Sequence, residues 1–136
     1  MRVVLALTAV LALSSCSSAS TQACGAAGAA SGVSFDTSSW SDAGPLTAHA
    51  CVGTRCVDRP LGNGQPRLIF VDAPSLSSDA PIAVSLTVQR PDSRAVFKAT
   101  TTVRPQKFLP NGQGCAPTAW QSRVQPTDHG LALVVK

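Results

Sequence analysis

The sequence contains no tyrosine and no glutamate, and its single methionine is the first residue. All seven acidic residues are aspartates, so the paired glutamates of many glycoside hydrolases are absent. Neither a Gly-x-Ser-x-Gly nucleophile elbow nor a phosphate-binding glycine loop occurs in the chain. Because these catalytic motifs are missing, we expect a protein that is not an enzyme and that uses no cofactor.

Long apolar runs are also missing, since a membrane-spanning helix takes about 20 apolar residues. The longest run, residues 3–13, has the length of a signal-peptide core and follows the positively charged Arg2. It leads into Leu13-Ser14-Ser15-Cys16, where small residues precede a cysteine. This order of features resembles the lipobox of bacterial lipoproteins, which implies cleavage after residue 15 and acylation of Cys16.

The resemblance to a lipoprotein divides the chain into three expected parts. Residues 1–15 are a signal peptide, residues 16–32 are the lipidated cysteine with a flexible tether of small residues, and residues 33–136 are one folded domain. It implies a protein held by its lipid on the extracytoplasmic face of the cell membrane, because two or three acyl chains make release negligible. An ordinary signal peptide cut at another position is the alternative. Loss of Arg2 lowers the net charge from +4 to +3, which is too small to imply nucleic acid as a partner.

Four cysteines remain after Cys16, and an even number in an exported chain predicts two disulfides. Cys51 and Cys56 enclose four residues with a glycine, enough for a turn that brings the two Cβ atoms to bonding distance. We therefore favour Cys51–Cys56 and, with it, Cys24–Cys115, which would fix half of the tether to the loop before the strand at Trp120. In the chain-entropy model these bonds stabilise the fold by about 2 and about 4–5 kcal/mol. A bond from Cys24 to Cys51 or Cys56 stays open as an alternative, because spacing alone does not decide it.

Seven short segments show the pattern of β-strands, either alternating apolar and polar residues or a continuous apolar run. They are residues 33–36, 46–52, 67–71, 82–89, 94–103, 120–125 and 131–135. Turn-forming stretches rich in glycine, proline, asparagine and aspartate separate them, and ten prolines argue against long helices. The expected fold is all-β, a small antiparallel β-sandwich stapled by disulfides.

In architecture this pattern resembles an immunoglobulin-like sandwich, although a chain without tyrosine cannot form the tyrosine corner of that fold. The segments at residues 33–36, 50–56 and 110–117 are also similar to small secreted lipoproteins of high-GC Gram-positive bacteria. That second resemblance supplies no activity.

Two alternative functions arise from the histidines. His49 with Cys51 and Cys56, and with His129 as a further candidate, offers ligands that suit zinc or copper(I), which would indicate a metal-handling envelope lipoprotein. Exported thiols tend to oxidise, however, so we expect disulfides and no metal ion. Asp128 beside His129, with many serines in the chain, would suit an envelope hydrolase. Adjacent residues on a turn usually point apart, which favours a plain polar turn instead.

A positive bias between residues 90 and 107 is the best candidate for a binding region. It comes from Arg94, Lys98, Arg104 and Lys107, together with Arg90. Arg94 and Lys98 are expected to share one solvent face of a strand, where they could meet anionic lipid headgroups or wall polymer. Such charges often only keep an exposed sheet soluble. The function we expect is a lipid-anchored, non-catalytic binding or accessory module at the cell envelope. Its expected partner, besides the membrane, is an anionic envelope polymer, a lipid or another envelope protein.

Overall fold

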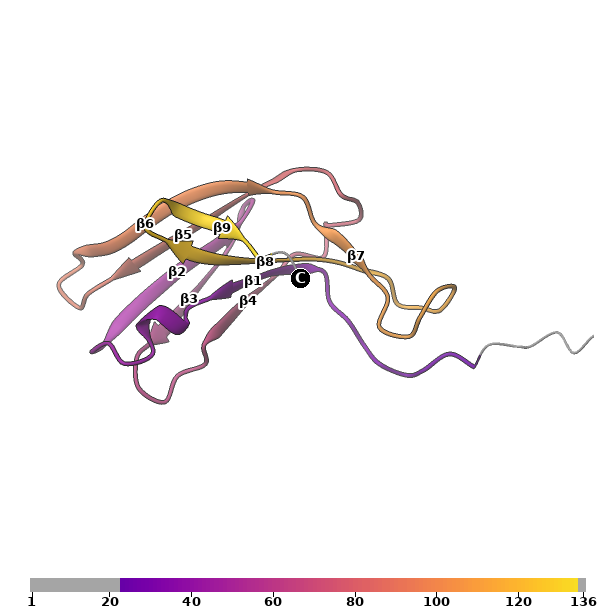
Figure 1. Cartoon of the computed structure of the whole chain (residues 1–136), viewed down its shortest axis with the longest axis horizontal. Helices are drawn as coiled ribbons and strands as arrows, with labels where there is room; N and C mark the ends of the chain where they lie inside the picture. The colour runs from indigo at the N-terminus through magenta and orange to yellow at the C-terminus, as the bar shows by residue number, and fades with distance from the viewer. Residues whose placement is uncertain (1–22, 135–136) are drawn as a thin grey trace, which may run out of the picture.

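The computed structural model describes residues 23–134, so the expected signal peptide and Cys16 lie outside the described residues. Within this range the chain forms nine strands and one short 3-10 helix, and no α-helix (Figure 1). The strands are β1 (Gly32–Asp36), β2 (Leu46–Val52), β3 (Arg55–Leu61), β4 (Leu68–Asp72), β5 (Ile82–Gln89), β6 (Ala95–Val103), β7 (Gln106–Phe108), β8 (Ala119–Thr127) and β9 (Gly130–Leu133). The 3-10 helix η1 (Ser38–Trp40) follows β1. No helix of residues 23–134 has the length and apolar character that crossing a membrane requires.

The strands make two sheets that pack face to face. The first, which we call sheet A, has the order β4-β1-β8-β7, and β9 pairs with the second half of β8. The second, sheet B, has the order β3-β2-β5-β6 and is antiparallel throughout. Figure 1 shows β6 of sheet B lying beside β9 of sheet A, so the two sheets approach each other along this edge. The expected all-β sandwich is confirmed.

The order of the strands is not that of immunoglobulin domains. Those domains place their first, second, fifth and fourth strands in one sheet, whereas sheet B here combines two hairpins, β2–β3 and β5–β6. Sheet A also contains a parallel pair, because β1 runs parallel to β8. The resemblance to immunoglobulin domains is therefore one of architecture and not of topology.

Two of the nine strands were not expected from the sequence. The seven expected segments all form strands at nearly the expected positions, and β3 and β7 are additional. β3 is mostly exposed and contains Pro60, which fits its place at the edge of sheet B because proline cannot donate to a ladder. β7 has three residues, all exposed. Neither strand has the apolar alternation that identifies a half-buried strand in a sequence.

The core lies between the two sheets and consists of the inward-facing side chains, which alternate with outward-facing ones along each strand. Val33 and Phe35 of β1 are fully buried, while Ser34 between them is not. In β5 the same alternation buries Val84, Leu86 and Val88. Phe35 is the largest of the fully buried side chains. The first position of β1, residue 32, requires glycine, because a Cβ there would collide with the backbone oxygen of Val71 on β4.

Both favoured disulfides are present. Cys51 and Cys56 are direct partners across the β2–β3 hairpin, whose turn uses Gly53 at a positive φ of 57°. Cys24 is bonded to Cys115, which is 91 residues away in the sequence and lies in the loop between β7 and β8. The alternative pairings of Cys24 are therefore ruled out.

The described part of the expected tether is fixed to the domain. Residues 23–31 form no strand, but Cys24 is bonded to Cys115, and Asn111 exchanges two hydrogen bonds with the backbone of Ala27. Asn111 Nδ2 donates to the Ala27 oxygen over 2.9 Å, and the Ala27 amide donates to Asn111 Oδ1 over 2.9 Å. The Ser31 hydroxyl accepts from the Trp120 amide. The favoured Cys24–Cys115 bond predicted that half of the tether is fixed to the domain, and this segment is indeed held from residue 24. The hydrogen bonds that Asn111 and Ser31 add were not expected.

Candidate functional site

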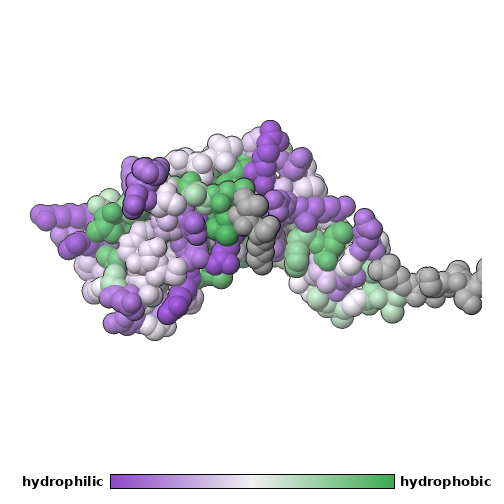
Figure 2. Space-filling view, in the orientation of Figure 1, coloured by the Kyte–Doolittle hydropathy of each residue, from purple (hydrophilic) through white to green (hydrophobic). Residues whose placement is uncertain are grey.

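The four cations proposed as a binding region are all exposed but do not form one cluster. Arg94 precedes β6 and Arg104 follows it, so they lie at opposite ends of a nine-residue strand that is roughly 30 Å long. Lys107 lies on β7, which belongs to sheet A. Figure 2 likewise shows hydrophilic side chains, in purple, spread along the whole visible face.

The expected common face of Arg94 and Lys98 is interrupted. Arg94 lies in the turn before β6 and pairs with Asp92, whose Oδ2 is 3.4 Å from Arg94 Nε. A register shift opposite Val88 and Gln89 places a bulge between Arg94 and Lys98, and a bulge breaks the alternation of side chains. Lys98 instead belongs to a row of outward residues that crosses sheet B. The row continues through Thr87, His49 and Asp58.

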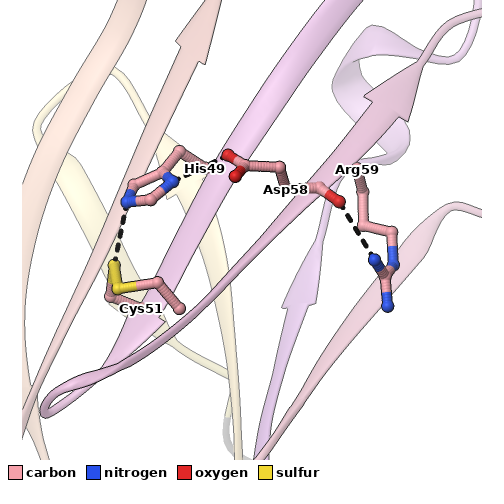
Figure 3. Close-up of polar contacts among 5 residues, drawn as sticks. His49, Cys51, Asp58 and Arg59 are labelled. Atoms are coloured by element: carbon pink, nitrogen blue, oxygen red, sulfur yellow. Dashed lines mark hydrogen bonds and ion pairs between the residues drawn. A yellow bond between two sulfur atoms is a disulfide. The ribbon is translucent and has the colours of Figure 1, made fainter.

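His49 is the centre of a polar cluster on the outer face of the β2–β3 hairpin (Figure 3). Its Nδ1 lies 2.7 Å from Oδ1 of Asp58, the residue directly opposite on β3. Its Nε2 lies 3.3 Å from Cys51 Sγ. The side chains of His49 and Asp58 are 48% and 70% exposed, so the cluster is open to solvent.

The predicted metal ligands are brought together only in part. The ligand atoms of His49, Cys51 and Cys56 lie within 4.8 Å of one another. Both sulfurs are joined in the disulfide, however, and zinc or copper(I) binds thiolates. His129 lies in the turn between β8 and β9 and does not belong to this group. The oxidised protein therefore lacks the thiolate ligands that the metal interpretation needs.

The pair expected for a hydrolase, Asp128 and His129, lies beside a groove of about 730 Å³ between β6 and the β8–β9 turn. No serine lines this groove among the described residues. The hydrogen bond found for His129 runs from its backbone amide to Thr127 Oγ1, over 3.3 Å. The arrangement is that of a polar turn, in which the Thr127 hydroxyl is bonded to the backbone of His129 and Gly130.

An apolar groove on sheet A was not expected from the sequence. It has a volume of about 380 Å³ and receives Leu68 from β4, Phe108 from β7 and Leu133 from β9. These three side chains are 42–46% exposed, and most of the other residues that line the groove are polar. Lys107 and Arg123 supply positive charge at the same groove. Phe108 lies in a segment without apolar alternation, so the sequence predicted neither a strand nor a groove there.

Arg123 is fixed at this groove by an ion pair across sheet A. Its Nη2 lies 2.6 Å from Oδ2 of Asp36, whose Oδ1 accepts a hydrogen bond from the Ser38 amide. Burial alone would raise the pKa of the Asp36 carboxyl, but the hydrogen bonds from Ser38 and Arg123 outweigh it and hold the pKa below its ordinary value. The charge of Arg123 is thus compensated, and among the described residues Lys107 has no ion-pair partner.

Comparisons of this chain with protein-family models, with curated proteins and with solved structures find no match.

Proposed function

We propose that the protein is a lipid-anchored, non-catalytic binding module on the extracytoplasmic face of the cell membrane, and that its partner is another envelope protein. The observation that carries this proposal is the exposed apolar groove on sheet A. Large exposed apolar side chains rimmed by polar residues are typical of interaction sites.

The chemistry of the groove favours a protein segment over a polyanion. Leu68, Phe108 and Leu133 provide apolar contacts from three different strands, and a polymer of charged groups has nothing to place against them. Lys107 adds one positive charge that no ion pair within residues 23–134 compensates. The matching partner is a segment with an apolar side chain next to a carboxylate. The scattered cations Arg94, Lys98 and Arg104 do not offer the continuous charged face that a wall polymer would use.

The docked N-terminal segment supports the role of the anchor. If Cys16 carries lipid, the free chain between the membrane and the domain ends at Cys24, because the bond to Cys115 fixes the chain there. Eight residues span at most about 29 Å. The anchor then holds the module close to the membrane, where envelope proteins are within reach.

The test places a photo-crosslinking amino acid, p-benzoylphenylalanine, at position 108 of the full chain in cells that export it. The matched control carries it at position 96. Val96 is exposed to a similar extent, 42%, but it lies on sheet B and not in the groove of sheet A. We expect discrete protein adducts from position 108 and none of the same size from position 96. Adducts with lipid only, or the same adducts from both positions, would contradict the proposal.

A second measurement determines how much the groove contributes. Phe108→Ser and Leu68→Ser should each weaken retention of the crosslinked partner by about thirtyfold, the effect of losing about 2 kcal/mol at a central apolar contact. Val96→Ser should leave retention unchanged. Circular dichroism should show all three variants folded, because exposed substitutions change stability by only about 0.5 kcal/mol. Equal retention by the wild type and both groove variants would rule out the groove as the binding surface.

A further inference from the structure

The outer face of the β2–β3 hairpin brings a disulfide, an imidazole and a carboxylate into line. Two neighbouring register pairs produce this arrangement: His49 lies opposite Asp58, and Cys51 lies opposite Cys56. As Figure 3 shows, the imidazole of His49 lies between the Asp58 carboxylate and the Cys51 sulfur, with one ring nitrogen toward each. The binding function proposed above uses none of these four residues.

The two contacts define which form of His49 satisfies both of them. The Asp58 carboxylate can only accept, so Nδ1 donates over 2.7 Å. A sulfur in a disulfide carries no hydrogen and can also only accept, so Nε2, which lies 3.3 Å from Cys51 Sγ, donates to it only when this nitrogen carries a proton. With Nδ1–H bonded to Asp58, that form is the imidazolium, which has a proton on each nitrogen. The geometry therefore places the nitrogen that can deliver a proton next to one of the two sulfurs.

The two sulfurs of this bond differ in their surroundings. Cys56 is exposed on edge strand β3, whereas Cys51 is half-buried and is contacted by His49. The other disulfide is different, because Cys115 is only 5% exposed and the bond has no histidine contact among the described residues. An external group reaches Cys56 most easily, and the bond then breaks toward Cys51.

We propose that Cys51–Cys56 is a thiol-exchange site, at which an external thiolate attacks Cys56 while His49 protonates the departing Cys51. The bond between the external sulfur and Cys56 Sγ forms, and the bond between the two cysteine sulfurs breaks with its electron pair on Cys51. The Nε2 proton of His49 moves to Cys51 Sγ, giving a neutral thiol and a neutral imidazole. The products are a mixed disulfide at Cys56 and a free Cys51 thiol, so charge and electrons balance.

Asp58 acts as a positioning residue in this step. It keeps Nδ1–H of His49 bonded before and after the proton leaves Nε2, which holds the ring in the orientation that contacts Cys51. The carboxylate also stabilises the imidazolium that delivers the proton. A carboxylate next to a catalytic histidine generally has both of these roles: it orients the ring and it stabilises the protonated form.

The hairpin tolerates the opening of this bond. β2 and β3 share seven register pairs, and β2 is also paired with β5, so the strands stay in place when the sulfurs separate. Only a loop of sequence separation five is released, compared with 91 for the other bond. Cys51 remains opposite Cys56 and can attack the mixed disulfide, which returns the external thiol. The exchange is reversible without unfolding.

The experiment treats the exported full chain, purified without reductant, with glutathione as a small thiol and with a cysteine-containing peptide as a model of a protein thiol. Free thiols are then alkylated and the modified cysteines are mapped by mass spectrometry. We expect the external thiol on Cys56 and the alkyl group on Cys51, while Cys24–Cys115 stays intact. The thiol that adds faster identifies the source, small molecule or protein, and either one supports the proposal when it adds at Cys56.

Variants separate proton delivery from simple exposure. His49→Gln should slow the adduct at Cys56 by about tenfold and let it form on both sulfurs, since the leaving-group preference is lost. Asp58→Asn should slow it less, and His129→Gln, at an exposed histidine outside this cluster, should change nothing. Equal rates for wild type and His49→Gln, or equal modification of Cys51 and Cys56 in the wild type, would overturn the proposal. A purely structural histidine would alter stability but not the choice of sulfur.

Discussion

At the scale of single residues, Asp36 connects three parts of the domain. Its carboxylate bonds Arg123 on β8 and the amide of Ser38 at the start of η1, while its backbone pairs with Leu68 on β4. The side chain is only 17% exposed, so water replaces these partners poorly. We infer that the ionised carboxylate stabilises sheet A next to the groove.

Asp36→Asn should lower the free energy of unfolding by about 1–3 kcal/mol at pH 7, because the amide loses charged hydrogen bonds. The folded-state pKa of Asp36 is lowered, so its contribution is present above the unfolded pKa of about 3.9 and is lost as the pH falls through the folded value. Denaturant unfolding at pH 7, 5, 3 and 2 should show the difference from wild type shrinking below about pH 4. Asp128→Asn, in an exposed turn, serves as the control. A difference that stays constant down to pH 2 would contradict this account.

The Cys51–Cys56 bond was predictable from residue spacing, whereas the contact between His49 and Asp58 was not. A loop of four residues with a glycine limits how Cys51 and Cys56 can be placed, so the sequence alone favours their bond. The His49–Asp58 contact depends instead on β3 pairing with β2 in one register. The Cys51–Cys56 bond implies that register only if residues 55–61 form a strand, and the polar segment from Arg55 to Leu61 does not have the pattern of one.

At the scale of elements, the predicted strands are those with one buried face. β5 is the clearest case, since Val84, Leu86 and Val88 are buried and the residues between them are not. β3 and β7 could not be predicted from alternating burial, because they are edge strands with almost no buried residue. Phe108 on β7 contributes to the groove, so the missed strand also explains why the groove was missed.

The N-terminal segment behaves as an added element, held by side chains instead of a ladder. Asn111 pairs with the amide and the oxygen of Ala27 as a neighbouring strand would, and it also donates to the oxygen of Ala116. Gln121 donates to the oxygen of Ala30 over 2.7 Å. A polar tract rich in alanine and glycine indicates flexibility, and no local pattern shows that a distant asparagine will bind it.

Asn111→Ala should release residues 26–29 from the domain without breaking the Cys24–Cys115 bond, whereas Ala30 and Ser31 keep their own hydrogen bonds to β8. The three lost hydrogen bonds should lower the free energy of unfolding by about 1–3 kcal/mol. Hydrogen exchange measured by mass spectrometry should show faster exchange in residues 26–29 and unchanged exchange in β5. Gln113→Ala, an exposed position in the same loop, is the matched control and should leave residues 26–29 protected. Unchanged exchange in the Asn111 variant would show that the disulfide alone holds this segment.

At the scale of the whole molecule, the N-terminal segment and the β7–β8 loop lie at one end of the sandwich, and the β5–β6 turn lies at the other (Figure 1). The two ends are separated by the length of β6, roughly 30 Å. A lipid on Cys16 would lie within about 29 Å of Cys24, the longest distance that eight residues can span. The disulfide then determines which end of the sandwich faces the membrane.

If Cys16 is acylated as proposed, the Cys24–Cys115 bond predicts an oriented domain. Energy transfer to acceptor lipids in vesicles should be strong from a dye at position 113 in the β7–β8 loop and weak from a dye at position 92 in the β5–β6 turn. Replacing both Cys24 and Cys115 by serine should reduce this contrast, because the longer free tether lets the domain rotate. Cys16→Ala should abolish transfer from both positions, since a chain without acyl groups leaves the membrane. An unmodified Cys16 thiol in the mass spectrum of the native protein would contradict the anchor, and equal transfer from positions 92 and 113 would contradict the orientation.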